Sequence, residues 1–135
     1  MQVFAATVAV VRSLNHTFSG SKAAADFLRA QKLDQGPMVF APDFVSLPVL
    51  AYLQRPSAYY VERHGAGSIV VWDKKEFYGR HMPSRAELQA ASTDGLSPVL
   101  ITEKPLTEEQ EQGLGVHRLA LISGEIDPDN YFIYR

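Results

Sequence analysis

From Pro37 to Asp43 the chain reads Pro-Met-Val-Phe-Ala-Pro-Asp, and this stretch decides the fold. A short, continuous apolar run bounded by proline and turn residues is typical of a buried strand. A helix is expected on either side of it, over residues 22–32 and over residues 47–54, where apolar residues recur at helical spacing or a proline occupies the first turn. Ser46 is the expected cap of the second helix. A buried strand between two helices indicates an α/β protein.

The alternation of strand and helix continues along the rest of the chain. Further strands are expected over residues 58–61, 68–72, 98–102, 117–122 and 131–134, the last as an edge strand. Capping-box patterns, Ser84 with Glu87 and Thr107 with Gln110, predict short helices over 84–91 and 107–112. Residues 2–14 fit a strand or a buried helix, and their apolar continuity and alanine content favour the helix.

This order of elements predicts crossover connections and a largely parallel sheet with helices on both faces. The strands over 58–61 and 68–72 are joined by too short a loop for a crossover, so one antiparallel pair is expected. The predicted fold class is therefore α/β, a three-layer αβα sandwich with a mostly parallel sheet of about five or six strands. At 135 residues, the chain is expected to form a single domain.

Composition and motifs exclude several classes of function. The net charge is −2 and basic residues are scattered, so a nucleic-acid partner is not expected. The chain has no cysteine, and its four histidines show no metal-binding spacing, so neither a metal site nor a cofactor is expected. Neither a G-x-S-x-G elbow nor a G-x-G-x-x-G turn between strand and helix is present. No catalytic residue is therefore assigned.

Candidate binding residues follow the expected strands. In open α/β sheets, ligands bind beyond the carboxyl ends of the strands. Trp72 offers an aromatic face on which a sugar could stack. The residues at or near these strand ends are Asp43, Arg63, His64, Trp72, Asp73 and Glu103. We take Asp43, Arg63, Trp72 and Asp73 as the predicted ligand-binding residues, for a sugar or an anion. The competing interpretation is structural, with Asp43 capping a helix or turn and Asp73 paired with a neighbouring Lys or Arg.

Three segments resemble a known family. They are Phe18 to Arg29 (Phe-Ser-Gly-Ser-Lys-Ala-Ala-Ala-Asp-Phe-Leu-Arg), Ala41-Pro-Asp leading to the stretch Pro48–Pro56, and Ser68 to Asp73. Together they resemble the soluble C-terminal region of bacterial multi-pass membrane proteins of the GT-C glycosyltransferase type, relatives of protein mannosyltransferases. The resemblance covers about the first half of the chain. It implies a periplasmic region that follows the last membrane span, with residues 1–17 leading from that span and Met1 not the native start.

The resemblance also implies what this region would do. Glycosyl transfer in that superfamily uses a polyprenyl-phosphate sugar, and its catalytic acids lie in the membrane part, so none is carried over here. The implied role is accessory, positioning a sugar or contacting the parent membrane domain, and Asp43, Trp72 and Asp73 are the positions linked to it. Two alternatives stay open: a freestanding sugar- or small-molecule-binding module, and a small α/β enzyme with Asp43 and Asp73 as an acid/base pair.

Overall fold

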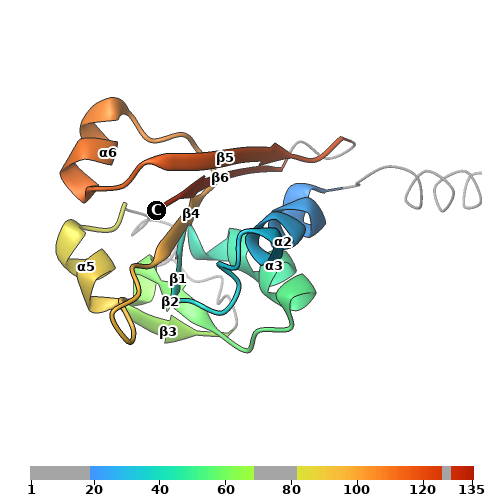
Figure 1. The fold of residues 1–135 in the computed structure, drawn as a ribbon, viewed down its shortest axis with the longest axis horizontal. Coiled ribbons are helices and arrows are strands. Elements are labelled where there is room, and N and C mark those ends of the chain that lie inside the picture. Colours follow the sequence, from blue (N-terminus) through green and yellow to red (C-terminus); the bar gives the residue numbers. More distant parts are fainter. Residues whose placement is uncertain (1–18, 69–81, 126–128) are drawn as a thin grey trace, which may run out of the picture.

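A computed structural model describes residues 19–68, 82–125 and 129–135, which form an α/β fold with one sheet between helices (Figure 1). The strands are β1 (Met38–Ala41), β2 (Ala58–Tyr60), β3 (Gly65–Gly67), β4 (Val99–Thr102), β5 (Arg118–Ser123) and β6 (Asn130–Tyr134). The α-helices are α2 (Gly20–Ala30), α3 (Ser46–Leu53), α5 (Arg85–Ala90) and α6 (Glu108–Leu114). Two 3₁₀ turns, η1 (Asp43–Val45) and η2 (Val61–Arg63), follow β1 and β2.

The strands of the sheet lie in the order β3-β2-β1-β4-β6-β5. The centre is parallel, because β1 pairs with both β2 and β4 in parallel. An antiparallel pair follows β2 as expected, but its second strand is β3 at residues 65–67 and not the stretch 68–72. Two further antiparallel pairs involve β6, which lies between β4 and β5. The α/β class and the mixed sheet of six described strands are thus confirmed, with more antiparallel pairing at the C-terminal side than the sequence indicated.

Successive residues of each central strand face opposite sides of the sheet, as the alternation of side chains along a strand requires. Met38 and Phe40 of β1 pack in one core cluster with α2 and α3. Val39 and Ala41 pack in a second cluster, with Leu88 of α5 and residues beside α6. Figure 1 shows the same three layers, with α2 and α3 on one side of the sheet and α5 and α6 on the other.

Local sequence signals explain where most helices begin. Ser19 is the N-cap of α2, and both predicted capping boxes are present at the starts of α5 and α6. The predicted cap of α3 is wrong, because Ser46 is the first residue of that helix and Val45 is its N-cap. The Ser46 hydroxyl instead donates a hydrogen bond to the buried Tyr60 hydroxyl (2.9 Å), joining α3 to β2.

Two other expectations about elements are wrong, and two more concern residues that the structure does not describe. The strand over 131–134 is not an edge strand, since β6 pairs with β4 on one side and β5 on the other. Residues 65–67, expected in a loop, form β3, whereas residues 69–72 of the expected third strand lie outside the described residues. The segment 2–14 also lies outside them. Over the ranges that the structure describes, no helix has the length and apolar character that a membrane crossing requires.

Candidate functional site

The chain reverses its direction of travel across the sheet between β1 and β4. From β1 it passes through α3 to β2 on one side, and after β3 it returns by way of α5 to β4 on the other side of β1. The segments that leave the carboxyl ends of β1 and β4 therefore diverge. Ligands of open α/β sheets bind at such a switch point, where the diverging segments leave a crevice.

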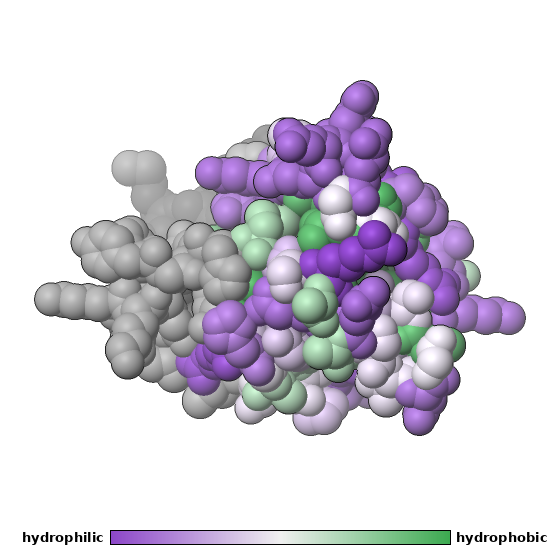
Figure 2. All heavy atoms as spheres, turned by 90° about the vertical axis from the view of Figure 1, so that its left-hand side faces the viewer, coloured by the Kyte–Doolittle hydropathy of each residue, from purple (hydrophilic) through white to green (hydrophobic). Residues whose placement is uncertain are grey.

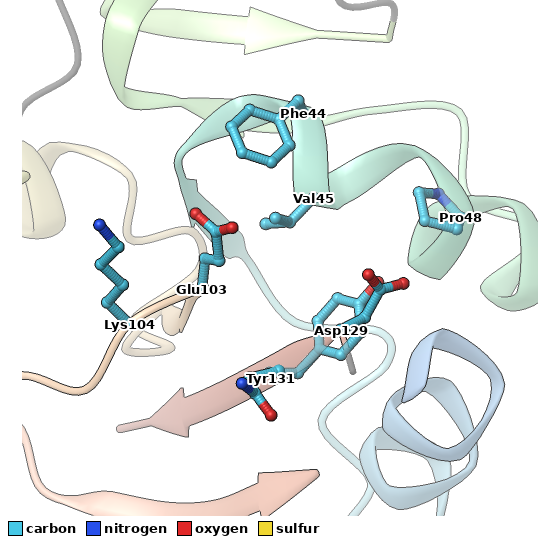
Figure 3. Close-up of a pocket in the computed structure, with 8 residues that line it drawn as sticks. Phe44, Val45, Pro48, Glu103, Lys104, Asp129 and Tyr131 are labelled. Carbon is cyan, nitrogen blue, oxygen red and sulfur yellow. The ribbon is translucent and has the colours of Figure 1, made fainter. Parts of the chain in front are cut away.

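A cavity of about 300 Å³ lies at this switch point. We call it the switch-point cavity, and three segments line it: the turn after β1, the turn after β4 and the start of β6 (Figure 3). Its lining residues are Phe44, Val45, Pro48, Glu103, Lys104, Asp129, Asn130 and Tyr131. This volume lies at the lower end of the range for small-molecule sites, about 300–1,000 Å³.

The walls of the switch-point cavity differ in chemistry. Phe44, Val45 and Pro48 form an apolar wall on η1 and α3. In Figure 3 the carboxylate of Glu103 points from the β4 turn toward this wall, and the carboxylate of Asp129 points toward it from the start of β6. An apolar wall facing a few polar groups is the usual composition of a site that orients a small ligand.

Hydrogen bonds hold the two polar segments of the cavity in place. After β4, the Thr102 hydroxyl donates to the Lys104 carbonyl (2.6 Å) and fixes the turn that carries Glu103. At the start of β6, the Ser123 hydroxyl of β5 donates to the Asn130 side-chain oxygen (2.6 Å). The Gly124 amide donates to the Asp129 carbonyl (3.1 Å) across the same hairpin. The cavity is therefore built on constrained backbone, which favours a fixed ligand geometry.

The structure places the predicted site residues as follows. Asp43 opens η1 directly after β1, at the switch point, but its side chain lies outside the described part of the structure. Arg63 ends η2 beside β2, is exposed, and does not line the switch-point cavity. Trp72 and Asp73 lie outside the described residues. Of the strand-end residues singled out from the sequence, Glu103 is the one whose described side chain lines the cavity.

His64, another strand-end residue, contacts α5 instead of the cavity. Its Nδ1 atom lies 2.6 Å from a carboxylate oxygen of Glu87, whose other oxygen accepts from the Ser84 amide (2.7 Å). Burial raises the pKa of the Glu87 carboxyl, but hydrogen bonds from Ser84 and His64 outweigh burial and hold this pKa below its usual value. This cluster links the end of β2 to the start of α5.

Sequence reasoning missed the side of the cavity that β6 provides. Asp129 and Asn130 precede the strand expected over 131–134, and residues that precede a parallel strand lie at the wrong end of the sheet for a switch-point site. Because β6 runs antiparallel to β4, its first residues meet the carboxyl end of β4 instead. Strand direction is not encoded in local pattern, so the sequence Asp-Pro-Asp-Asn at 127–130 is typical of a turn and indicates nothing about a cavity.

Comparisons of this chain with protein-family models, with curated proteins and with solved structures give no match. Within the described ranges, no group of three or more His, Asp or Glu side chains is placed to hold a metal ion.

Proposed function

We propose that this chain is a non-catalytic α/β domain that binds a sugar unit in the switch-point cavity, as the accessory extracytoplasmic part of a bacterial membrane glycosyltransferase-like protein. One observation carries the proposal: the cavity joins an apolar wall at Phe44 and Pro48 to the facing carboxylates of Glu103 and Asp129. A pyranose presents the same two kinds of surface, an apolar C–H face and a ring of hydroxyl donors.

The donor and acceptor pattern supports a sugar over other small ligands. Ionised carboxylates only accept hydrogen bonds, so Glu103 and Asp129 select a ligand rich in hydroxyl or amino donors. A phosphate or carboxylate ligand would meet two like charges there, and among the described lining residues Lys104 is the one cation. The sugar of a polyprenyl-phosphate donor, with its phosphate outside the cavity, fits this charge pattern.

The membrane part of the proposal rests on the sequence resemblance at Phe18–Arg29, Ala41–Asp43, Pro48–Pro56 and Ser68–Asp73. If it holds, the open reading frame extends upstream into several apolar spans, and the partner of this domain is that parent membrane domain. A native start at Met1 would contradict it. Sugar binding in the switch-point cavity would survive that result, and the chain would then be a freestanding sugar-binding module.

The test of sugar binding is a calorimetric or NMR titration with a panel of methyl glycosides. We expect saturable binding of at least one glycoside, weakened tenfold or more in Glu103→Gln and in Asp129→Asn. Glu109→Gln is the matched control, because Glu109 is an exposed carboxylate on α6 that does not line the cavity. Absence of binding across the panel, or equal binding in all variants, would contradict the proposal.

A further inference from the structure

A second hollow lies between α5 and α6, on the face of the sheet opposite α2 and α3. It measures about 220 Å³, and we call it the helix groove. Its lining residues are Arg85, Leu88, Gln89, Ser92, Ser97, Pro98, Leu114, Gly115, Val116 and Arg135. Pro98 precedes β4 and Arg135 follows β6, so the groove reaches the end of the sheet opposite the switch-point cavity.

The floor of the helix groove is apolar. Leu88 is buried, and Leu114 and Val116 pack as partly buried residues against the same core cluster. Figure 2 looks onto this face and shows apolar atoms lying deeper than the hydrophilic side chains around them. A ligand in the groove would therefore rest part of its surface on carbon.

The charged side chains that line the helix groove are positive. Arg85 and Arg135 both line it, and none of the described lining residues is acidic. Among the described residues, no carboxylate forms an ion pair with either guanidinium. The Arg85 guanidinium lies over Gly115, the left-handed C-cap of α6, where an added Cβ would meet it at 3.5 Å. That distance is an ordinary contact, so the left-handed backbone of the cap, and not the guanidinium, favours glycine at this position.

From these observations we propose that the helix groove binds a small organic anion, a phosphate monoester or carboxylate joined to a few carbon atoms. Two guanidiniums offer the forked donors that bind such oxyanions in bidentate fashion. The apolar floor takes the carbon part of the ligand. Since ligand pockets commonly measure about 300 Å³ or more, a groove of this size selects a small ligand or one end of a larger one.

Butyl phosphate is the probe that tests the helix groove, with inorganic phosphate and butanol as its two halves. In an NMR titration of the ¹⁵N-labelled protein, we expect butyl phosphate to shift the amide signals of Gly115 and Val116 saturably and to bind more tightly than either half. In the double variant Arg85→Gln/Arg135→Gln its affinity should fall tenfold or more. Arg118→Gln, an exposed arginine on β5 that does not line the groove, should bind as the wild type does.

The positive charge of Arg85 beside the C-terminal end of α6 could also act only on helix stability. Arg85→Lys separates the two roles, because it keeps the charge and loses the fork. We expect it to retain the melting temperature of the wild type while its affinity for butyl phosphate falls several-fold. Unchanged affinity in the double Gln variant, or no saturable shift at Gly115, would overturn the proposal.

A vesicle assay distinguishes two sources of the anion, a lipid headgroup and a free phosphomonoester. If the protein co-sediments with phosphatidylcholine vesicles that contain phosphatidic acid, and butyl phosphate competes with this binding, the proposal is supported with a lipid headgroup as the ligand of the groove. Butyl phosphate binding without co-sedimentation would support the proposal with a free phosphomonoester as the ligand. Absence of both would overturn it, and neither result depends on whether the switch-point cavity binds a sugar.

Discussion

The switch-point cavity and the helix groove lie at opposite ends of the same central strands and differ in charge. Among the described lining residues, two carboxylates and one lysine belong to the first, whereas the second has two arginines and no acidic side chain. Both have an apolar side built from residues that also seal the core. Topology therefore fixes where a hollow forms, whereas the residues in the surrounding turns and helix ends decide which ligand it suits.

The largest effect is expected in the strand that both hollows share. Ile101 in β4 is fully buried at the centre of the sheet. Ile101→Ala removes buried methyl groups and leaves a cavity, so the free energy of unfolding should fall by about 2–5 kcal/mol. Urea denaturation measures this change, with Leu121→Ala on the exposed side of β5 as a control that should change little. A small effect at Ile101 would contradict the central place of β4.

The next effect concerns the side of the sheet that carries the helix groove. The Tyr134 hydroxyl of β6 accepts a hydrogen bond from the buried Leu106 amide (2.8 Å), just before α6. Tyr134→Phe leaves that amide without its acceptor, so we expect a loss of about 1–3 kcal/mol in the free energy of unfolding. Tyr52→Phe is the exposed control. Butyl phosphate affinity should fall in Tyr134→Phe while glycoside affinity is retained, and the reverse pattern would contradict the comparison.

Gly20 offers the matching perturbation of the switch-point cavity. A Cβ at Gly20 would lie 3.0 Å from the Asp129 carbonyl oxygen and 3.1 Å from the Gly124 nitrogen. Overpacking of about 1–3 kcal/mol opposes a gain in helix propensity of about 1 kcal/mol, so Gly20→Ala should lower the free energy of unfolding by about 1 kcal/mol.

Glycoside affinity, measured by calorimetry, should fall in Gly20→Ala because Asp129 shifts, while butyl phosphate affinity should not change. Gly113→Ala on α6 is the control, since nothing lies within 4 Å of its added Cβ. A gain in stability with unchanged glycoside affinity would contradict this prediction, because the hairpin would then accommodate the added Cβ without a change in the cavity.

The smallest effect is a dependence of stability on pH at Glu87, outside both proposed ligand sites. Its pKa is lowered in the folded protein, so it contributes stability above its unfolded value near 4.5 and loses it as the pH falls through the folded pKa. Glu87→Gln should lower the free energy of unfolding by about 0.5–1 kcal/mol at neutral pH. The variant should also lose less stability than the wild type as the pH falls. Melting temperatures from pH 7 to pH 3 measure this, and parallel curves for variant and wild type would contradict it.

Local signals in the sequence predicted the elements well, and non-local pairing limited the rest. The capping boxes at Ser84 and Thr107 were correct because a capping box involves only neighbouring residues. Gly65–Gly67 was missed as a strand because glycine carries no side-chain pattern, and β3 exists through its pairing with β2.

The same distinction between local signals and non-local pairing applies to the residues of the candidate site. Glu103 was on the list of strand-end residues, because it follows a parallel strand, but it was not among the four predicted ligand-binding residues. Asp129 was missed because the direction of β6 and its insertion between β4 and β5 are set by packing at long range. The apolar wall at Phe44 and Pro48 was also missed, since an apolar residue in a turn has the same sequence pattern whether it packs in the core or lines a cavity.

The claim that the two hollows bind different ligands is tested most directly by an NMR titration of one ¹⁵N-labelled sample with the two ligands in turn. We expect the bound methyl glycoside to shift the amide signals of Val45, Lys104 and Asn130. Butyl phosphate should shift those of Gly115 and Val116, and neither ligand should displace the other. Both ligands shifting the same set of amides, or the glycoside shifting none of the cavity residues, would contradict it.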